Sequence, residues 1–134
     1  MTFKEIQENY RSARENERRK VIVKLQGEGY NASCRGGRGI MTYTSGGRIE
    51  PYDLRNFMWV EAKKGNYTYF ISLNPFDTDP VSKSKHFLPD RLGICKYEGA
   101  YNADYVYHNM KVTDIDLPLY DKELDLLIRE LEEL

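Results

Sequence analysis

The acid and the lysine at positions 61 and 63 are the side chains best suited to chemistry in this sequence. They lie in an apolar run typical of a strand, in which alternate side chains point to the same face. Glu61 and Lys63 then share a face with Trp59, while Val60 and Ala62 form the opposite, core-facing side. A carboxylate can bind a divalent cation, and a lysine can orient or help to deprotonate an attacking water. The pair therefore indicates a minimal apparatus for hydrolysing a phosphodiester.

A metal site needs a second carboxylate beside Glu61, and the preceding residues offer Glu50 and Asp53. If the two segments form a hairpin, the loop length decides which acid lies opposite Glu61. A two-residue loop at residues 55–56 places Glu50 there. A longer loop centred at Phe57 places Asp53 there instead. The sequence leaves both registers open, and the expected cation in either is Mg²⁺ or Mn²⁺.

The N-terminal segment, residues 3–26, predicts one long helix. Its apolar side chains recur at helical spacing, and Gly27 and Gly29 follow as a stop. A shorter helix that ends near Arg19, followed by a strand at residues 21–25, is the alternative, because β-branched residues favour strands. The stripe keeps its register through this segment, which favours the long helix. The stripe consists of Phe3, Ile6, Tyr10, Ala13, Val21 and Leu25.

An acid also falls on this stripe, since Glu17 lies four residues from both Ala13 and Val21. A carboxylate on the apolar side of a helix needs a cationic partner or a metal, because an unpaired buried charge is costly. Two hypotheses follow. Glu17 completes the metal site beside Glu61 and Lys63, or it forms an ion pair with a lysine or an arginine.

The rest of the chain alternates strand patterns with turns and ends in an amphipathic helix. Residues 74–90 hold three prolines and predict a long loop. The order helix, strands, helix is typical of an α+β fold, so we expect one domain over residues 1–134 with a mixed or antiparallel sheet of about five strands flanked by the two helices. Strands are expected at residues 30–34, 40–44, 48–53, 57–63, 67–73, 92–97 and 104–112. The C-terminal helix is expected at residues 119–134, with an apolar face of Tyr120, Leu124, Leu127, Ile128, Leu131 and Leu134.

Asp53 followed by Glu61-Ala-Lys63 on an apolar strand resembles the PD-(D/E)xK nuclease superfamily, which includes archaeal Holliday junction resolvases and many restriction enzymes. The likeness covers residues 10–73 and includes an upstream helix with an inward acid and a Gly-bounded turn. It implies a restriction-endonuclease-like fold and a divalent-metal-dependent DNA endonuclease that acts on branched or otherwise distorted DNA. DNA is the implied partner, and a homodimer is the expected assembly. The implied metal and catalytic residues are Asp53, Glu61, Lys63 and Glu17, and the implied phosphate contacts are Arg35, Gly36, Gly37 and Arg38.

The net charge of -1 conceals an asymmetry between the two halves of the chain. Residues 1–66 carry 13 basic and 8 acidic side chains, a net of +5, whereas residues 67–134 carry 7 and 13, a net of -6. A basic half is compatible with DNA, because neutralisation of phosphates dominates that affinity. The alternative is that the two halves pair with each other in space.

Tyrosine is unusually frequent, with 11 copies in 134 residues. Exposed tyrosines provide a large contact area at low entropy cost, which suits protein partners. Half-buried positions in a sheet are the ordinary alternative, since tyrosine favours strands. The tyrosines support a second functional hypothesis, a small non-catalytic binding protein that inhibits or recruits a macromolecular partner through a Tyr-rich sheet face. Those that crowd a strand or hairpin are Tyr67, Tyr69, Tyr97, Tyr101, Tyr105 and Tyr107.

Composition excludes several classes of protein. Charged residues make up 31% and hydrophobic residues 40% of the chain, a balance typical of a globular rather than a disordered sequence. No apolar run approaches the ~18 residues of a membrane-spanning helix, and the N-terminus lacks the apolar core of a signal peptide. The two cysteines are too few for a disulfide framework. We therefore expect a cytoplasmic protein without membrane contact.

Overall fold

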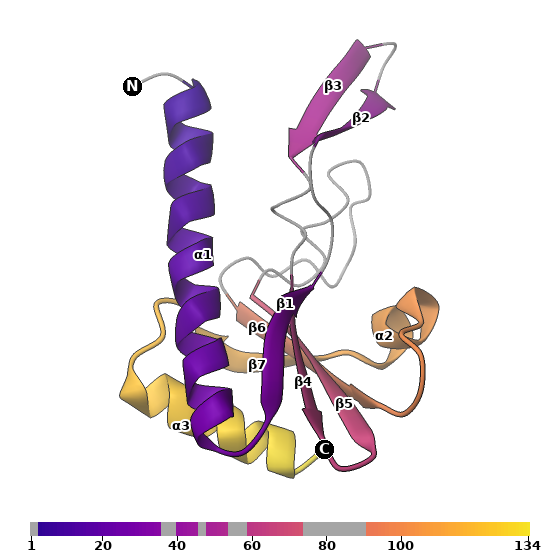
Figure 1. Cartoon of the computed structure of the whole chain (residues 1–134). Coiled ribbons are helices and arrows are strands. Elements are labelled where there is room, and N and C mark those ends of the chain that lie inside the picture. Colours follow the sequence, from indigo (N-terminus) through magenta and orange to yellow (C-terminus); the bar gives the residue numbers. More distant parts are fainter. Residues whose placement is uncertain (1–2, 36–39, 46–47, 54–58, 74–90) are drawn as a thin grey trace.

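The computed structural model describes residues 3–35, 40–45, 48–53, 59–73 and 91–134. Within these ranges the chain forms three helices and seven strands (Figure 1). The helices are α1 (Phe3–Gly27), α2 (Ala103–Asn109) and α3 (Asp121–Glu132). The strands are β1 (Asn31–Arg35), β2 (Ile40–Ser45), β3 (Arg48–Asp53), β4 (Trp59–Lys64), β5 (Tyr67–Ser72), β6 (Arg91–Tyr97) and β7 (Lys111–Asp116).

Five of the described strands form one antiparallel sheet in the order β1-β4-β5-β6-β7. Strands β2 and β3 pair with each other in a separate hairpin. Helices α1 and α3 pack on one face of the five-stranded sheet, and α2 packs on the other (Figure 1). The expected α+β fold is therefore confirmed, with the terminal helices on the same face.

The main core lies between the sheet and the two terminal helices. Strand alternation sends Val60 and Ala62 of β4 to this face, as predicted, where they join Val21 and Leu25 of α1 in one buried cluster. Leu127 of α3 is completely buried in the same cluster. The apolar sides of both helices and the inner face of the sheet thus share one core.

Helix α1 continues without interruption through residues 21–25, so the long helix is confirmed and the alternative strand is wrong. Val21 and Leu25 lie one turn apart and both are buried, which a helix achieves and a strand does not. The helix ends at Gly27, and Gly29 adopts a φ of 90°. This left-handed conformation favours glycine and turns the chain toward β1.

The segment 104–112, which was expected to be one strand, is instead the short helix α2 followed by β7. The side chain of Asn102 accepts a hydrogen bond of 3.0 Å from the backbone N–H of Tyr105, which caps the helix at its start. Val106 is the buried residue of α2. Tyrosine and valine favour strands, but the cap and this single apolar anchor decide the local structure here.

Two side chains expected on apolar faces, Ala13 and Tyr120, are exposed. In α1 the buried side passes through Arg14 and Arg18, one position away from the predicted stripe. Tyr120 precedes α3, and its backbone N–H donates to Glu123 Oε2 at 3.3 Å. It therefore belongs to the start of the helix rather than to its apolar face.

Helix α1 is long, with 25 residues, but it is rich in charged side chains. Among the described helices, none combines the length and the apolar character needed to cross a membrane.

Candidate functional site

Glu61 and Lys63 lie on the face of β4 that looks toward α2, away from the main core. Their strand alternates as predicted, because Val60 and Ala62 belong to the core cluster on the opposite face. In the ladder, Glu61 lies between Ser33 of β1 and Phe70 of β5. The predicted juxtaposition of this acid and this lysine on one strand face is therefore confirmed.

The carboxylate of Glu61 is mostly buried, with 9% of the residue exposed, and two cations flank it. Arg35 Nε lies 3.8 Å from Oε2, and Lys63 Nζ lies 3.8 Å from Oε1. Both cations are largely exposed, so they contact the carboxylate from its solvent-facing side. In this arrangement the charge of Glu61 is balanced by side chains of the chain itself.

Tyr97 of β6 is electrostatically coupled to Glu61 on this face. Burial and the negative charge of Glu61 raise the pKa of Tyr97 from 10.0 to about 12, and Arg35 opposes the shift. The raised pKa means that the unfolded chain loses this proton first as the pH increases. Stability associated with Tyr97 is therefore complete below about pH 10 and is lost as the pH rises through about 12.

We expect the Glu61→Gln variant to lower the pKa of Tyr97, because it removes one cause of the upward shift. Ultraviolet absorbance of the tyrosinate, compared with a Tyr97→Phe background, measures the change. An unchanged titration curve would show that Glu61 and Tyr97 are not coupled. Arg35→Gln is the opposite control, because it removes the charge that lowers this pKa.

Glu17 lies on the other side of the sheet from Glu61. Its Oε1 accepts a hydrogen bond of 2.8 Å from Lys20 Nζ, and its Oε2 accepts one of 2.8 Å from the backbone N–H of Leu119. Helix α1 covers the face of β4 opposite Glu61. The expected proximity of Glu17 to Glu61 is therefore wrong, and the alternative, an ion pair with a lysine or an arginine, is confirmed.

Glu50 and Asp53 lie on β3, which pairs with β2. The ladder neighbours of β4 are β1 and β5, so neither predicted hairpin register places an acid of β3 opposite Glu61. The side chains of Glu50 and Asp53 lie outside what the structure describes, as do Gly36, Gly37 and Arg38 entirely. Of the expected phosphate-contact residues, Arg35 is described, exposed and placed beside Glu61.

No three His, Cys, Asp or Glu side chains within the described ranges form a group that could hold a metal ion. The described acids that were expected to cooperate, Glu17 and Glu61, are separated by the sheet. The Mg²⁺ or Mn²⁺ site stays a prediction.

An aromatic cluster lies on the α2 face next to Glu61. The rings of Trp59 and Tyr101 stack with centroids 5.0 Å apart, and Trp59 and Phe70 lie 5.4 Å apart. Tyr97 contacts Tyr101 edge-on at 6.3 Å. Buried Phe70, Tyr97 and Val106 form the base of this cluster. These contacts give Tyr101 a defined position although 43% of it is exposed.

Two further tyrosines of this region, Tyr105 and Tyr107, are 47% and 41% exposed. We call the exposed rings of Tyr101, Tyr105 and Tyr107 around α2 the tyrosine surface; Tyr105 and Tyr107, two residues apart, point to different sides of this helix. A hollow of about 340 Å³ lies beside it, lined by Tyr97, Glu98, Ala100, Asn102 and Tyr105. Tyr67 and Tyr69 share a strand face as predicted, but Tyr69 packs into the main core on the α1 side.

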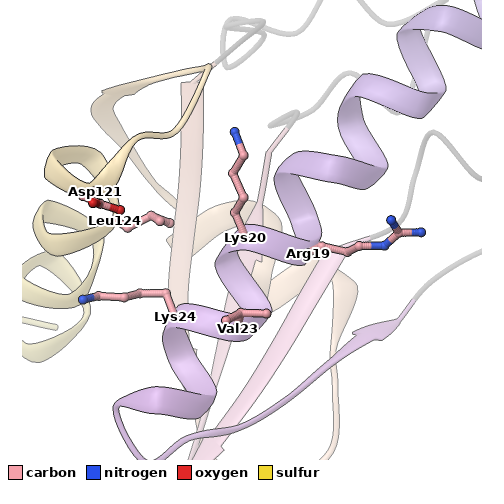
Figure 2. A pocket seen from close by; sticks show the side chains of 6 residues that line it. All are labelled: Arg19, Lys20, Val23, Lys24, Asp121 and Leu124. Carbon is pink, nitrogen blue, oxygen red and sulfur yellow. The ribbon is translucent and has the colours of Figure 1, made fainter.

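A second hollow, of about 420 Å³, lies between α1 and α3. Figure 2 shows Lys24 pointing toward α3 and Arg19 pointing away from it. The Nζ of Lys24 lies 2.7 Å from Asp125 Oδ1, a hydrogen bond that lowers the pKa of this carboxyl. This pair joins the basic and the acidic halves, so part of the charge asymmetry is neutralised within the molecule. The six lining residues are Arg19, Lys20, Val23, Lys24, Asp121 and Leu124.

Two buried arginines, Arg14 and Arg18, were missed by the sequence analysis. They lie four residues apart on the sheet-facing side of α1, where the predicted stripe placed Ala13 and Glu17. Their spacing of one helical turn was the available signal, because it puts both on one side of the helix. Arg14 Nη1 donates to the backbone carbonyl of Leu73, just after β5.

Comparisons with protein-family models, curated proteins and solved structures found no match to this chain. No family relationship therefore assigns an activity to Glu61 and Lys63. The PD-(D/E)xK resemblance, DNA binding and a homodimer stay predictions.

Proposed function

We propose that this chain is a small non-catalytic protein that binds a protein partner through the tyrosine surface around α2. The observation that carries the proposal is the exposure of Tyr101, Tyr105 and Tyr107, at 43%, 47% and 41%, within one short segment. A group of exposed large side chains around one short element is typical of an interaction site, whereas single exposed ones are common on any surface. Tyrosine is enriched at protein interfaces, where its ring packs and its hydroxyl keeps a polar partner.

The base beneath the tyrosine surface supports the same proposal. Tyr101 stacks on Trp59 at 5.0 Å, and the buried Phe70 lies 6.3 Å from Tyr101. Val106 anchors α2 to this base. An interface anchor that is already ordered loses little conformational entropy when a partner binds, so such positions contribute strongly to affinity.

Acidic side chains border the tyrosine surface and indicate the chemistry of the partner. Glu98 lines the hollow, and Asp104 lies in the first turn of α2. Both are exposed. The complementary protein surface therefore carries apolar or aromatic groups for the rings and lysine or arginine side chains for the acids.

A non-catalytic role is favoured over the nuclease hypothesis by the position of the acids. Glu17, which the nuclease hypothesis adds to complete the metal site, lies on the opposite face of the sheet from Glu61. Glu61 is flanked by Arg35 and Lys63 at 3.8 Å each. Arg35 in this position competes with a divalent metal for the carboxylate oxygens, whereas Lys63 lies where the nuclease hypothesis expects it.

The test of the binding proposal compares two exposed tyrosines. Tagged protein is used to isolate partners, and the dissociation constant of each purified partner is then measured. We expect Tyr105→Ala to raise that constant by about tenfold or more, as for a typical interface anchor. Tyr120→Ala is the matched control, because Tyr120 is exposed at the start of α3 on the other side of the sheet. Equal losses from the two variants, or none from the combined Tyr101, Tyr105 and Tyr107 alanine variant, would contradict the proposal.

A cleavage assay separates this function from the nuclease hypothesis. We expect purified protein with Mg²⁺ or Mn²⁺ to leave labelled duplex, single-stranded and four-way-junction DNA intact. Gel electrophoresis of the labelled strands is the measurement. Cleavage that disappears in Glu61→Gln would overturn the non-catalytic proposal and locate a nuclease site at Glu61.

A further inference from the structure

The hollow beside the tyrosine surface is built by one continuous stretch of chain. Its lining residues all lie between positions 97 and 105, where the chain leaves β6, turns and enters α2. Gly99 permits this turn, because its φ of 78° is a left-handed conformation that favours glycine. Asn102 Oδ1 accepts a hydrogen bond of 3.0 Å from the backbone N–H of Tyr105, which fixes the turn against the start of α2. The hollow, of about 340 Å³, is therefore formed before any partner binds.

The rim of this hollow carries negative charge. Glu98 lines it, is exposed, and forms no ion pair with a lysine or an arginine in the described ranges. Asp104, next to the lining residue Tyr105, is also exposed and has no such partner among the described residues. The N-terminus of α2 offsets only part of this charge, since a helix end is equivalent to about half of one positive charge. A positively charged group is therefore the electrostatic complement of the hollow.

Two tyrosines of different exposure also line the hollow. Tyr105 is 47% exposed, so much of its ring is open to contact. Tyr97 is only 7% exposed, and its hydroxyl has no hydrogen-bond partner within the described part of the chain. Burial and the charge of Glu61 raise the pKa of Tyr97 to about 12, so this hydroxyl keeps its proton at neutral pH and can donate or accept. Polar atoms of buried residues usually have a partner, which leaves this hydroxyl for a group that enters the hollow.

We propose that the hollow binds one arginine side chain of the protein partner. This inference rests on the proposed binding function and specifies what the partner presents beside the tyrosine surface. A guanidinium is charged at neutral pH and carries five N–H donors, which suit the carboxylate of Glu98 and the tyrosine hydroxyls. Its planar face also stacks on a tyrosine ring, whereas the ammonium of lysine is a strongly hydrated point charge. An arginine therefore uses the charge, the acceptors and the rings of the hollow together.

The hollow between α1 and α3 provides an internal comparison. Three of its six lining residues are basic, namely Arg19, Lys20 and Lys24, and Asp121 is the one acid among them. A guanidinium that entered this second hollow would meet like charges and no tyrosine among the lining residues. We therefore expect arginine to bind beside α2 and not between α1 and α3.

The experiment titrates the full chain with a capped Gly-Arg-Gly peptide at millimolar concentration. The same peptide with citrulline in place of arginine is the reference, because citrulline has nearly the same shape without the charge. Two-dimensional proton–nitrogen NMR should show saturable shifts of backbone amides in residues 98–105 and of the Asn102 side-chain amide with the arginine peptide only. A Gly-Lys-Gly peptide should bind severalfold more weakly, because it lacks the planar fork.

Three variants test the residues that line the hollow. Glu98→Gln should weaken binding of the arginine peptide by about tenfold, since it removes a charged hydrogen-bond acceptor. Tyr97→Phe should weaken it by a smaller factor, because it removes only the hydroxyl. Asp121→Asn is the matched control, since it removes an equal charge from the other hollow and should leave binding unchanged. Thermal unfolding followed by circular dichroism verifies that each variant is folded.

A fourth variant separates this proposal from the binding function on which it rests. Tyr107 belongs to the tyrosine surface but does not line the hollow, so Tyr107→Ala should keep the arginine peptide bound while it weakens binding of the protein partner. The arginine proposal is overturned if the peptide causes no shifts in residues 98–105, if the citrulline or lysine peptide binds equally well, or if Glu98→Gln retains full affinity. Peptide binding that persists while no tyrosine variant affects the protein partner contradicts the proposed function instead.

Discussion

Leu127→Ala is expected to lower the free energy of unfolding by about 2–5 kcal/mol. Leu127 has no exposed surface, and it joins α3 to the cluster that includes Val21 of α1 and Val60 of β4. Truncation removes buried apolar surface and leaves a cavity, and both effects destabilise the folded state. The free energy of unfolding of a typical domain is only about 5–15 kcal/mol, so this loss is a large fraction of it. Urea unfolding followed by circular dichroism measures it.

The adjacent leucine is the matched control, because Leu126 is 37% exposed on the same helix. We expect Leu126→Ala to cost less than about 1 kcal/mol, as surface substitutions usually do. Similar costs for the two substitutions would show that α3 does not present its Leu127 side to the sheet. That result would contradict the packing of the terminal helices on one face.

Phe70→Ala is expected to lower the free energy of unfolding by about 3–5 kcal/mol, because it leaves a cavity at the base of the aromatic cluster on the α2 face. Phe70 contacts Trp59 at 5.4 Å and Tyr101 at 6.3 Å between ring centroids. The chain has one tryptophan, so its fluorescence reports this environment alone. We expect urea unfolding at a lower concentration and a red-shifted emission from Trp59 in the folded variant.

A tyrosine of the same strand provides the control for Phe70. Tyr67 lies on the opposite face of β5 and is partly exposed, with Lys96 Nζ 4.0 Å from its ring centroid. Tyr67→Ala should cost about 1 kcal/mol and leave the emission of Trp59 unchanged. If Tyr67→Ala shifted the emission as strongly as Phe70→Ala, the assignment of the two strand faces would be wrong. If the tyrosine surface binds a protein, Phe70→Ala should also weaken that binding, because Tyr101 loses its support.

Local patterns were sufficient to predict most of the helices and strands. The unbroken helix over residues 21–25 followed from a stripe that keeps its spacing, and the strands expected at residues 57–63 and 67–73 correspond to β4 and β5, which a turn at Gly65, with a φ of 64°, connects. The segment 104–112 was assigned incorrectly because valine and tyrosine suit both a strand and a short capped helix. The cap by Asn102 is local, because it joins residues three positions apart. The helix also depends on the burial of Val106 against strands that are distant in the sequence.

Strand order could not be obtained from the sequence in the same way. Glu50 and Asp53 were expected beside Glu61 because consecutive strands usually pair. In the structure β1 occupies that side of β4, and β3 pairs with β2. Which strands pair depends on how the whole sheet face is buried by segments distant in the sequence. The short distance along the sequence between two strands therefore does not predict whether they pair.

The sequence by itself determined that Glu61 and Lys63 point to one side of β4 and Val60 to the other, because alternation along a strand is a local property of the backbone. Only the tertiary structure decided which side α1 covers. The helix packs on Val60, where apolar area is buried, and this places Glu17 behind the sheet from Glu61. The rotation of α1 was also decided by tertiary contacts, because its N-terminal half has a weak apolar stripe. Successive residues of a helix point about 100° apart, so a rotation of α1 by one residue places Arg18 on the buried side, where the acid Glu17 was expected.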